Sequence, residues 1–395
     1  MKSMLTVALL FVALTFVEGA EVAFSHDHIK VRGHFSQTLT KLKKDRQLRI
    51  AFLGGSITQN QKGHSGTVPK LLRELSPGAD VQALNAGLSS TCSTSGAFRL
   101  KSHVLDSGPV DLFIVEFAVN DDQDAAHASR ECLRGMEGII RQMRTLSPQT
   151  EIVMVHYLNT DIMETIQKGD VPVTIAAHEK VAEHYGVSTV SVAAEVALAI
   201  KGGKYTWKDY GGVHPKSFGY EIASRMIVSA ITAGWERSDS PRDRKLPKQL
   251  DAGNYAGGEF VPVGNATTSG EWKTGKPTRE LLPIGGLRTQ YSDYDLLRGE
   301  KIGDMLKLEF EGTAIGAFVL AGPDAGMVAT RMDGGTFVEH DLYHRYSKGL
   351  NYPRSVMFHT DLKPGKHTLD LVVSDNANPA SKGHAVNILF FEVNR

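Results

Sequence analysis

The stretch LRIAFLGGSIT, residues 48–58, decides the fold of the first half of this chain. Its first six residues form a mainly apolar run of strand length, and Gly54 and Gly55 end the run. Small neighbours let the backbone turn sharply and leave the Ser56 hydroxyl exposed at the carboxyl edge of a parallel sheet, where α/β proteins place their sites. The alternative is that these residues form an ordinary turn and that Ser56 has no catalytic role. The stretch lacks the Lys-Ser/Thr ending of a phosphate loop and the third glycine of a dinucleotide fingerprint, which excludes both nucleotide sites.

Short apolar runs alternate with amphipathic stretches from this point to about Trp235. Apolar residues three and four apart predict helices that face a core, and short unbroken apolar runs predict buried strands. Strands that alternate with helices imply an α/β domain with a parallel sheet covered on both faces. The expected strands are 48–53, 81–84, 111–117 and 152–155, and the expected helices are 131–146, 174–185 and 218–233.

Composition narrows the class of protein. The 395 residues are 41% apolar, which allows a sizeable core in two domains. The 44 basic residues balance 44 acidic ones, which argues against a dedicated binder of nucleic acid or anionic membranes. Two cysteines are too few for a disulfide-dense scaffold or a four-cysteine zinc site. Lys2, the apolar run 5–17 and the small residues Gly19 and Ala20 predict a cleaved signal peptide, with an uncleaved membrane anchor as the alternative.

The pattern changes after Trp235. Residues 238–249 carry Pro241 and Pro247 without apolar periodicity, which is typical of a linker. From about residue 255 short β-rich runs follow, and strict alternation in 305–310 and 367–373 predicts antiparallel strands with one wet face. A β-sandwich suits this length and pattern. We therefore expect a signal peptide at 1–20, a lead-in segment at 21–46, an α/β domain at 47–236, a linker at 237–254 and a β-sandwich domain at 255–395.

Polar residues follow two more strands of the predicted sheet. Gly87 follows the second strand and Asn120 follows the third, so a glycine amide and an asparagine amide reach the same edge as Ser56. Such groups are suitable donors to a tetrahedral oxyanion, although each alone is more often a turn residue. His214 stands in a loop before a predicted helix, where a general base competes with the simpler reading of a solvated side chain.

These residues together resemble the SGNH or GDSL-like hydrolase superfamily. The resemblance rests on four blocks in order over about 190 residues: Gly54-Gly55-Ser56-Ile57-Thr58, Asn85-Ala86-Gly87, Ala118-Val119-Asn120-Asp121 and Val213-His214-Pro215. It implies a flavodoxin-like three-layer α/β/α domain and a serine esterase without metal or cofactor. It also implies Ser56 as nucleophile, His214 as base, and an oxyanion hole from the Ser56 and Gly87 amides and the Asn120 side chain.

The chain departs from the family pattern at the acid of the triad. The family usually places an aspartate three residues before its histidine, and this chain has Gly211 there. Asp209 is the nearest acid, and two glycines could fold it back onto the imidazole. A Ser–His dyad oriented by a backbone carbonyl is equally open, and Glu116 is a further possible partner unless it only ties down a loop.

The roles of two further groups of residues remain open. Cys92 lies just after Gly87, and Cys132 starts the predicted helix after Asn120. In an exported protein a disulfide between them would tie two site-forming loops, whereas two buried thiols are the alternative. Tyr205, Trp207 and Tyr210 beside the histidine loop could stack on a sugar or belong to the core or a lid.

The sequence thus predicts a secreted or periplasmic serine esterase that removes carboxylic, mainly acetyl, esters from a polysaccharide or oligosaccharide. The carbohydrate target rests on analogy with exported members that carry an appended β-sandwich. We expect the sandwich to wall one side of the cleft, and we expect neither a nucleic-acid partner nor stable membrane insertion after signal cleavage. A lipase or lysophospholipase and an O-acyltransferase are alternative enzymes. A carbohydrate-binding protein on a decayed hydrolase fold is the non-enzymatic alternative.

Overall fold

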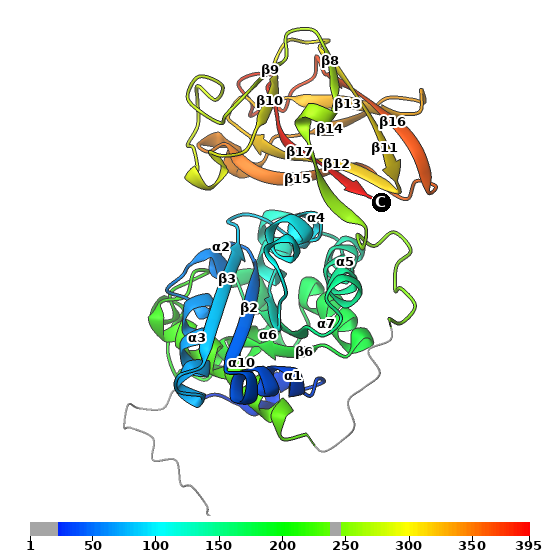
Figure 1. The fold of residues 1–395 in the computed structure, drawn as a ribbon. Coiled ribbons are helices and arrows are strands. Elements are labelled where there is room, and N and C mark those ends of the chain that lie inside the picture. The colour runs from blue at the N-terminus through cyan, green and yellow to red at the C-terminus, as the bar shows by residue number, and fades with distance from the viewer. Residues whose placement is uncertain (1–22, 238–245) are drawn as a thin grey trace, which may run out of the picture.

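The computed structural model describes residues 23–237 and 246–395. The expected signal peptide and part of the expected linker lie outside these residues. The described chain forms an α/β domain followed by a β-sandwich, which sits on one side of the α/β domain near helices α4 and α5 (Figure 1). None of the helices in the two described ranges has the length and apolar character needed to cross a bilayer.

A mixed, mainly parallel sheet forms the centre of the α/β domain. In the described chain its strand order is β1-β6-β5-β4-β2-β3, and only β1 pairs antiparallel. The five parallel strands follow the flavodoxin-like order, in which sites form at the carboxyl ends of the strands. Their bounds are β1 Ile29–Lys30, β2 Gln47–Gly54, β3 Asp80–Gly87, β4 Leu112–Val115, β5 Glu151–His156 and β6 Ser188–Ser191.

Helices cover both faces of this sheet, as the alternating pattern predicts. Successive residues of β2 point to opposite faces, so that Phe52 packs with helices α3, α8 and α10 while Leu53 packs with α4, α5 and α7. The helices are α1 Ser36–Thr40, α2 Ser56–Gln59, α3 His64–Leu75, α4 Ser93–His103, α5 Ser129–Leu146, α6 Thr160–Lys168, α7 Val173–Tyr185, α8 Val192–Lys201, α9 Trp207–Tyr210 and α10 Ser217–Trp235. The expected α/β/α architecture is confirmed.

The lead-in segment belongs to the α/β domain. Strand β1 extends the sheet beside β6, where Ile29 pairs with Val190, and Phe35 packs into the core under α10. The domain therefore begins before residue 47. A two-residue strand carries no periodicity, so the sequence pattern could not reveal it.

The second domain consists of two antiparallel sheets. One has the order β15-β12-β17-β10-β9 with β7 also paired to β17, and the other has the order β14-β13-β16-β11-β8. Strand β11 alternates exposed and buried residues along its whole length, which confirms the expected wet face. The strands are β7 Gly258–Pro262, β8 Thr267–Ser269, β9 Lys273–Gly275, β10 Leu296–Gly299, β11 Met305–Gly312, β12 Ala314–Ala321, β13 Met327–Met332, β14 Val338–Asp341, β15 Tyr352–His359, β16 Gly365–Val373 and β17 Val386–Asn394.

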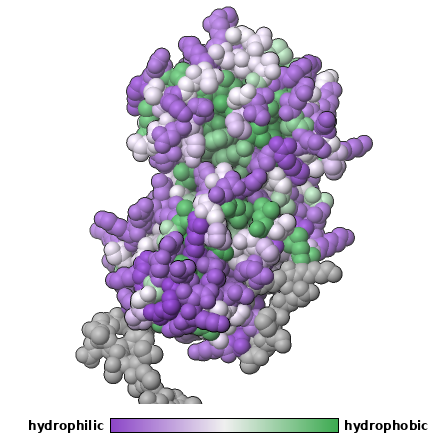
Figure 2. Space-filling model, in the orientation of Figure 1, coloured by the Kyte–Doolittle hydropathy of each residue, from purple (hydrophilic) through white to green (hydrophobic). Residues whose placement is uncertain are grey.

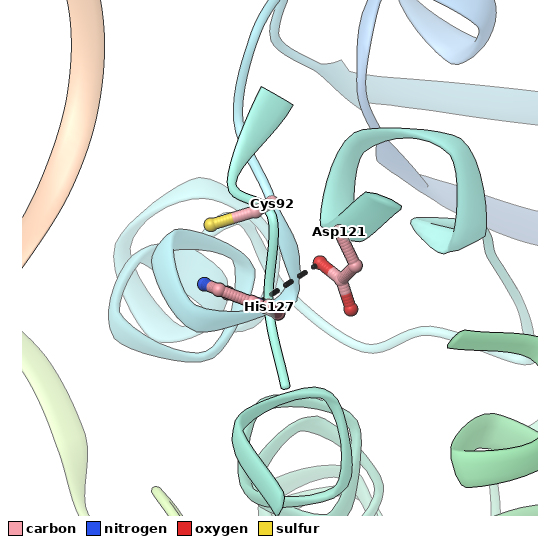
Figure 3. Close-up of side chains that lie close together, drawn as sticks. All are labelled: Cys92, Asp121 and His127. Carbon is pink, nitrogen blue, oxygen red and sulfur yellow. Dashed lines mark ion pairs between the residues drawn. The ribbon is translucent and has the colours of Figure 1, made fainter. Parts of the chain in front are cut away.

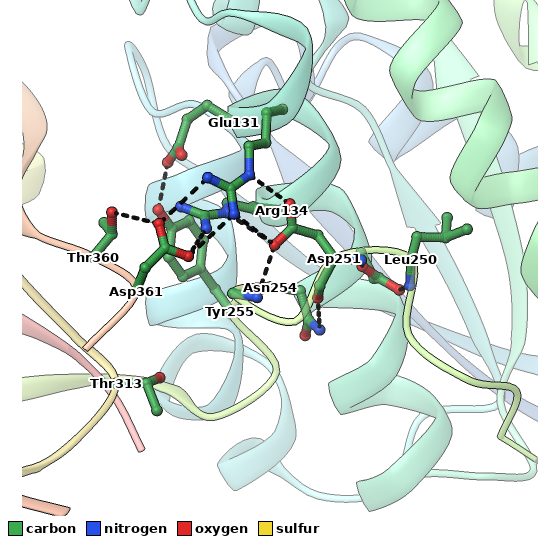
Figure 4. Close-up of polar contacts among 12 residues, drawn as sticks. Glu131, Arg134, Leu250, Asp251, Asn254, Tyr255, Thr313, Thr360 and Asp361 are labelled. Carbon is green, nitrogen blue, oxygen red and sulfur yellow. Dashed lines mark hydrogen bonds and ion pairs between the residues drawn. The ribbon is translucent and has the colours of Figure 1, made fainter. Parts of the chain in front are cut away.

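The described end of the expected linker is fastened to α5. Arg134, almost fully buried, pairs with Asp251 of the linker and with Asp361 of the sandwich (Figure 4). The Glu137 carboxylate accepts the Leu250 and Asp251 amides at 2.6 and 2.9 Å. The linker is thus bonded to α5 at residues 250 and 251, and Arg134 contacts both the linker and the sandwich. In the view of Figure 2, hydrophilic residues dominate the lower part of the α/β domain, and apolar residues show mainly on the sandwich and near the junction of the two domains.

Candidate active site

The structure brings the expected nucleophile and base together. Ser56 is the first residue of α2, directly after β2, and His214 lies in the loop between α9 and α10. The Ser56 Oγ lies 2.7 Å from the His214 Nε2, within hydrogen-bond distance. A histidine nitrogen in this position can take the serine proton as the hydroxyl attacks an ester.

Glu116 holds the nucleophile turn from beneath. Its Oε1 accepts the Gly55 amide at 3.0 Å and the Thr58 hydroxyl at 2.6 Å, and burial raises the pKa of the Glu116 carboxyl to about 7. Only glycine fits at Gly54, because an added Cβ would lie 2.2 Å from that oxygen. Glu116 thus ties down a loop, as one of its two sequence-based readings predicts, and its described contacts do not include His214.

Arg99 is a functional residue that sequence reasoning missed. It is fully buried in α4, where its guanidinium donates to the Ala86 carbonyl at 2.6 Å and to the Gly54 carbonyl at 2.9 Å. Burial lowers the pKa of Arg99 to about 10. The side chain therefore clamps the ends of β2 and β3 beside Ser56. No local signal marks it, because an arginine on an amphipathic helix is usually solvated.

Asn120 lies against the nucleophile turn, as expected. An added Cβ at Gly55 would lie 2.2 Å from its Oδ1 and 2.8 Å from its Nδ2, so the side chain packs directly on the turn that carries Ser56. Asn120 is 2% exposed, and its Nδ2 donates one hydrogen bond to the Asp124 Oδ2 at 2.6 Å. The second N–H of this amide is left for another acceptor.

The expectation for Gly87 needs correction. Its amide donates to the Asn85 Oδ1 at 2.8 Å and is therefore already committed. Gly87 instead lets the chain pass close to α2, since an added Cβ would lie 2.3 Å from the Gln59 nitrogen. Three residues on, Ser90 has a φ of 68°, in the left-handed region that side-chain-bearing residues seldom adopt. The Ser90 amide has no hydrogen-bond acceptor among the described residues.

Asp209 does not reach His214. Its Oδ2 accepts the Thr206 amide at 3.0 Å and the Thr206 hydroxyl at 2.6 Å, which is a capping box at the start of α9. The hydroxyl and amide of Thr206 hold the pKa of this carboxyl below its usual range. The His214 Nδ1 has no hydrogen-bond partner within residues 23–237 and 246–395. The geometry is thus that of a Ser–His pair, and the expected place of Asp209 in a triad is corrected.

The three aromatic residues near the histidine loop belong to the core. Tyr210 is fully buried, Trp207 stacks on it with ring centroids 5.6 Å apart, and Tyr205 packs edge-on against Phe218. None of the three lines the pocket at Ser56. Tyr210 is therefore not available to a sugar, whereas Tyr205 and Trp207 are half-buried against the core, and their expected role in sugar stacking stays a prediction.

A polar pocket of about 370 Å³ opens beside the nucleophile. Two of its lining residues come from the sandwich, which confirms that this domain walls one side of the site. All of its lining residues have polar side chains, which supply hydrogen-bond donors and acceptors. Its lining residues are Ser56, Gln59, Asn60, Ser89, Arg288 and Gln290.

Cys92 and Cys132 are both buried free thiols in the structure, so the expected disulfide is absent from the described chain. Both thiols face His127. Burial alone would lower the pKa of His127, but this pKa lies above its ordinary value, and the charged group beside it is the Asp121 carboxylate, 3.7 Å from the His127 Nδ1. Burial raises the pKa of Cys132 to about 11, which keeps this thiol neutral and poorly nucleophilic.

The cluster of Cys92, Asp121 and His127 has the residue types of a metal site, with ligand atoms within 4.8 Å of one another (Figure 3). Its carboxylate is committed elsewhere. Asp121 accepts the Ser93 amide and hydroxyl, both at 2.7 Å, and lies 2.9 Å from the His178 Nε2. The cluster therefore joins the loop after Asn120 to the start of α4.

Comparisons with known proteins agree with this site. Residues 52–222 match the GDSL-like lipase/acylhydrolase family. No curated protein matches the sequence. The crystal structure of a two-domain esterase active on acetylated mannans, co-crystallised with mannopentaose, is similar, with a TM-score of 0.74, 19% identity, and coverage of 93% of this chain and 96% of that chain. A second structure of a two-domain esterase active on acetylated mannans has a TM-score of 0.73 at 19% identity, covering 93% and 97%.

At this identity the two structures show a shared two-domain fold. The family match contains all four sequence blocks and leaves out only the two ends of the first domain. Residues 52–222 thus match the GDSL-like lipase/acylhydrolase family, and this match indicates a serine-type carboxylic-ester hydrolase.

Proposed function

We propose that this protein removes acetyl groups from an acetylated polysaccharide or oligosaccharide. The observation that carries the proposal is the polar pocket beside the Ser56–His214 pair, which has hydrogen-bonding side chains from both domains. A sugar presents many hydroxyl groups to such a lining, and an acetyl group needs little apolar space. The similar two-domain esterases act on acetylated mannans, which supports a carbohydrate ester as substrate.

The proposed reaction is acyl transfer through Ser56. His214 takes the hydroxyl proton as the Ser56 Oγ attacks the ester carbonyl, and the carbonyl oxygen becomes an oxyanion. The Ser56 amide and the free N–H of Asn120 are its donors. His214 then protonates the sugar alkoxide that leaves, and a water molecule activated by His214 releases acetate from the acetyl-serine.

A Ser–His dyad performs these steps in this proposal. The described structure offers no carboxylate to the His214 Nδ1, and Asp209 serves as a helix cap. A base needs an orienting group, but that group need not be a carboxylate. Without one, the imidazolium that forms in the transition state receives less stabilisation, so a moderate turnover is expected.

The pocket lining disfavours a lipase or lysophospholipase. A long acyl chain needs a continuous apolar wall, since burying each CH₂ contributes about 0.8 kcal/mol. The described pocket offers serine, asparagine, glutamine and arginine side chains instead. Export to the cell exterior or periplasm is part of the proposal and rests on the N-terminal sequence alone.

Acetate release from a panel of acetylated glycans, together with hydrolysis of 4-nitrophenyl esters of increasing chain length, tests this proposal. We expect acetate release from at least one acetylated glycan, and turnover that falls sharply from acetate to octanoate. The His214→Ala variant is the matched control and must lose both activities. Faster turnover of octanoate than of acetate, with no acetate released from any glycan, would contradict it.

A further inference from the structure

The sandwich grips the loop that joins β3 to α4. This loop, residues 88–92, is tied to the nucleophile turn because the Leu88 amide donates to the Gly54 carbonyl at 2.9 Å. The Leu88 side chain is 7% exposed and packs into an apolar cluster whose other buried members all belong to the sandwich. Those members are Leu281, Leu282, Tyr291, Leu296, Phe318, Leu320 and Leu389. A residue of the α/β domain, Leu88, is thus part of a hydrophobic core of the sandwich.

Arg288 of the sandwich holds the same loop by its polar atoms. Its Nη1 donates to the Ser90 Oγ at 2.9 Å and to the Ser89 carbonyl at 3.3 Å, and the Tyr291 hydroxyl donates to that carbonyl at 3.4 Å. These contacts hold Ser90 in its left-handed conformation, which is unfavourable for a residue with a side chain. A strained residue persists only where its surroundings impose it.

A second loop of the site is enclosed by the sandwich in the same way. Asp124, which binds the Asn120 amide, lies at the domain junction, and the Tyr352 side chain of β15 faces it. Burial raises the pKa of the Asp124 carboxyl, the nearby charges of Arg345 and Arg288 oppose this rise, and the Arg345 guanidinium also donates to the Gln123 carbonyl. The sandwich therefore contacts both loops that meet at Ser56.

We propose that the C-terminal sandwich assembles the oxyanion pocket of this esterase, with Arg288 as its main positioning residue. Arg288 fixes the Ser89–Ser90 loop so that the free Ser90 amide serves as a backbone donor in place of the Gly87 amide, which Asn85 occupies. Asp124, enclosed by the sandwich, fixes the Asn120 amide. This inference rests on the proposed esterase mechanism and adds that catalysis on the smallest ester depends on the sandwich.

The test uses the full chain and two substrates, 4-nitrophenyl acetate and an acetylated mannan oligosaccharide. Arg288→Ala should lower kcat on 4-nitrophenyl acetate about 10- to 100-fold with little change in KM, because misplaced donors act on the transition state. Arg288→Lys should recover part of the loss, since one ammonium can still bind the Ser90 hydroxyl. Arg331→Ala is the matched control: it removes a sandwich arginine that pairs with Asp370 at 2.9 Å, and it should leave kcat unchanged.

A contact with the glycan alone would give a different result. In that case Arg288→Ala would raise KM on the oligosaccharide and leave kcat on 4-nitrophenyl acetate unchanged, which would overturn the proposal. Equal losses in the Arg288→Ala and Arg331→Ala variants would overturn it as well, because they would reflect general damage to the sandwich.

Variants of Asp124 test independently whether this residue positions the Asn120 amide. Asp124→Ala should lower kcat on 4-nitrophenyl acetate, and Asp124→Asn should retain most of it, because the asparagine oxygen can still accept from Asn120. Full activity in Asp124→Ala would contradict the role of this loop. Failure of the esterase mechanism itself would show differently, as wild-type protein without turnover of either substrate.

Discussion

Replacing Glu116 with glutamine should make the protein more stable at high pH. Burial raises the pKa of the Glu116 carboxyl from 4.5 in the unfolded chain to about 7 in the folded protein. Between these values the folded state keeps a proton that the unfolded chain has released, so stability falls as the pH rises through this window. At 1.36 kcal/mol for each pKa unit, the total fall due to this group is about 3 kcal/mol.

Glutamine keeps the carbonyl oxygen that accepts from Gly55 and Thr58, and it never ionises. The free energy of unfolding of Glu116→Gln should therefore rise relative to wild type by about 3 kcal/mol between pH 4 and pH 8. Urea unfolding of both proteins across this range measures the difference. Glu392→Gln is a positive control, because burial also raises the pKa of Glu392, to about 8, in the sandwich. Its free energy of unfolding relative to wild type should change with pH in the same direction. A difference between Glu116→Gln and wild type that stays constant with pH would refute the reasoning.

Three further changes test the site. Asn120→Ala should lower kcat on 4-nitrophenyl acetate roughly 10²- to 10³-fold if its amide is an oxyanion donor, and an unchanged kcat would remove it from the pocket. Asp209→Asn should cost little turnover, because the carboxylate caps α9, whereas a loss near 10⁴-fold would restore it to a triad. Thiol titration of the denatured, unreduced protein should find both Cys92 and Cys132 reactive, and no reactive thiol would mean that they are bridged.

Local patterns were sufficient for the architecture, whereas the roles of Ser56 and His214 came from the resemblance of four ordered blocks to a known family. Strand β2 and helix α5 follow their apolar periodicities, and Ser56 and His214 lie in turns that small residues mark. The strands β1 and β6 were not foreseen, because β1 has only two residues and β6 has a single apolar residue, whereas the equally short β4 is wholly apolar.

Contacts between distant segments could not be predicted in the same way. Arg99 and Arg288 act through partners that lie far away in the sequence or in another domain. Asp209 and Gly87 were misassigned for a related reason: their nearest partners, Thr206 and Asn85, are close neighbours along the chain that bind them first. Hydrogen bonds to residues two or three positions away compete with hydrogen bonds to distant residues, and the local backbone conformation determines which of them forms.

The most direct test of the central claim is acetate release by wild-type protein and the Ser56→Ala variant on the same acetylated glycan. The exposed Ser102→Ala variant in α4 serves as a control for the loss of one hydroxyl. The account predicts that wild type and Ser102→Ala release acetate at equal rates, and that Ser56→Ala is folded and releases none. Acetate release by purified Ser56→Ala at the wild-type rate would contradict the account.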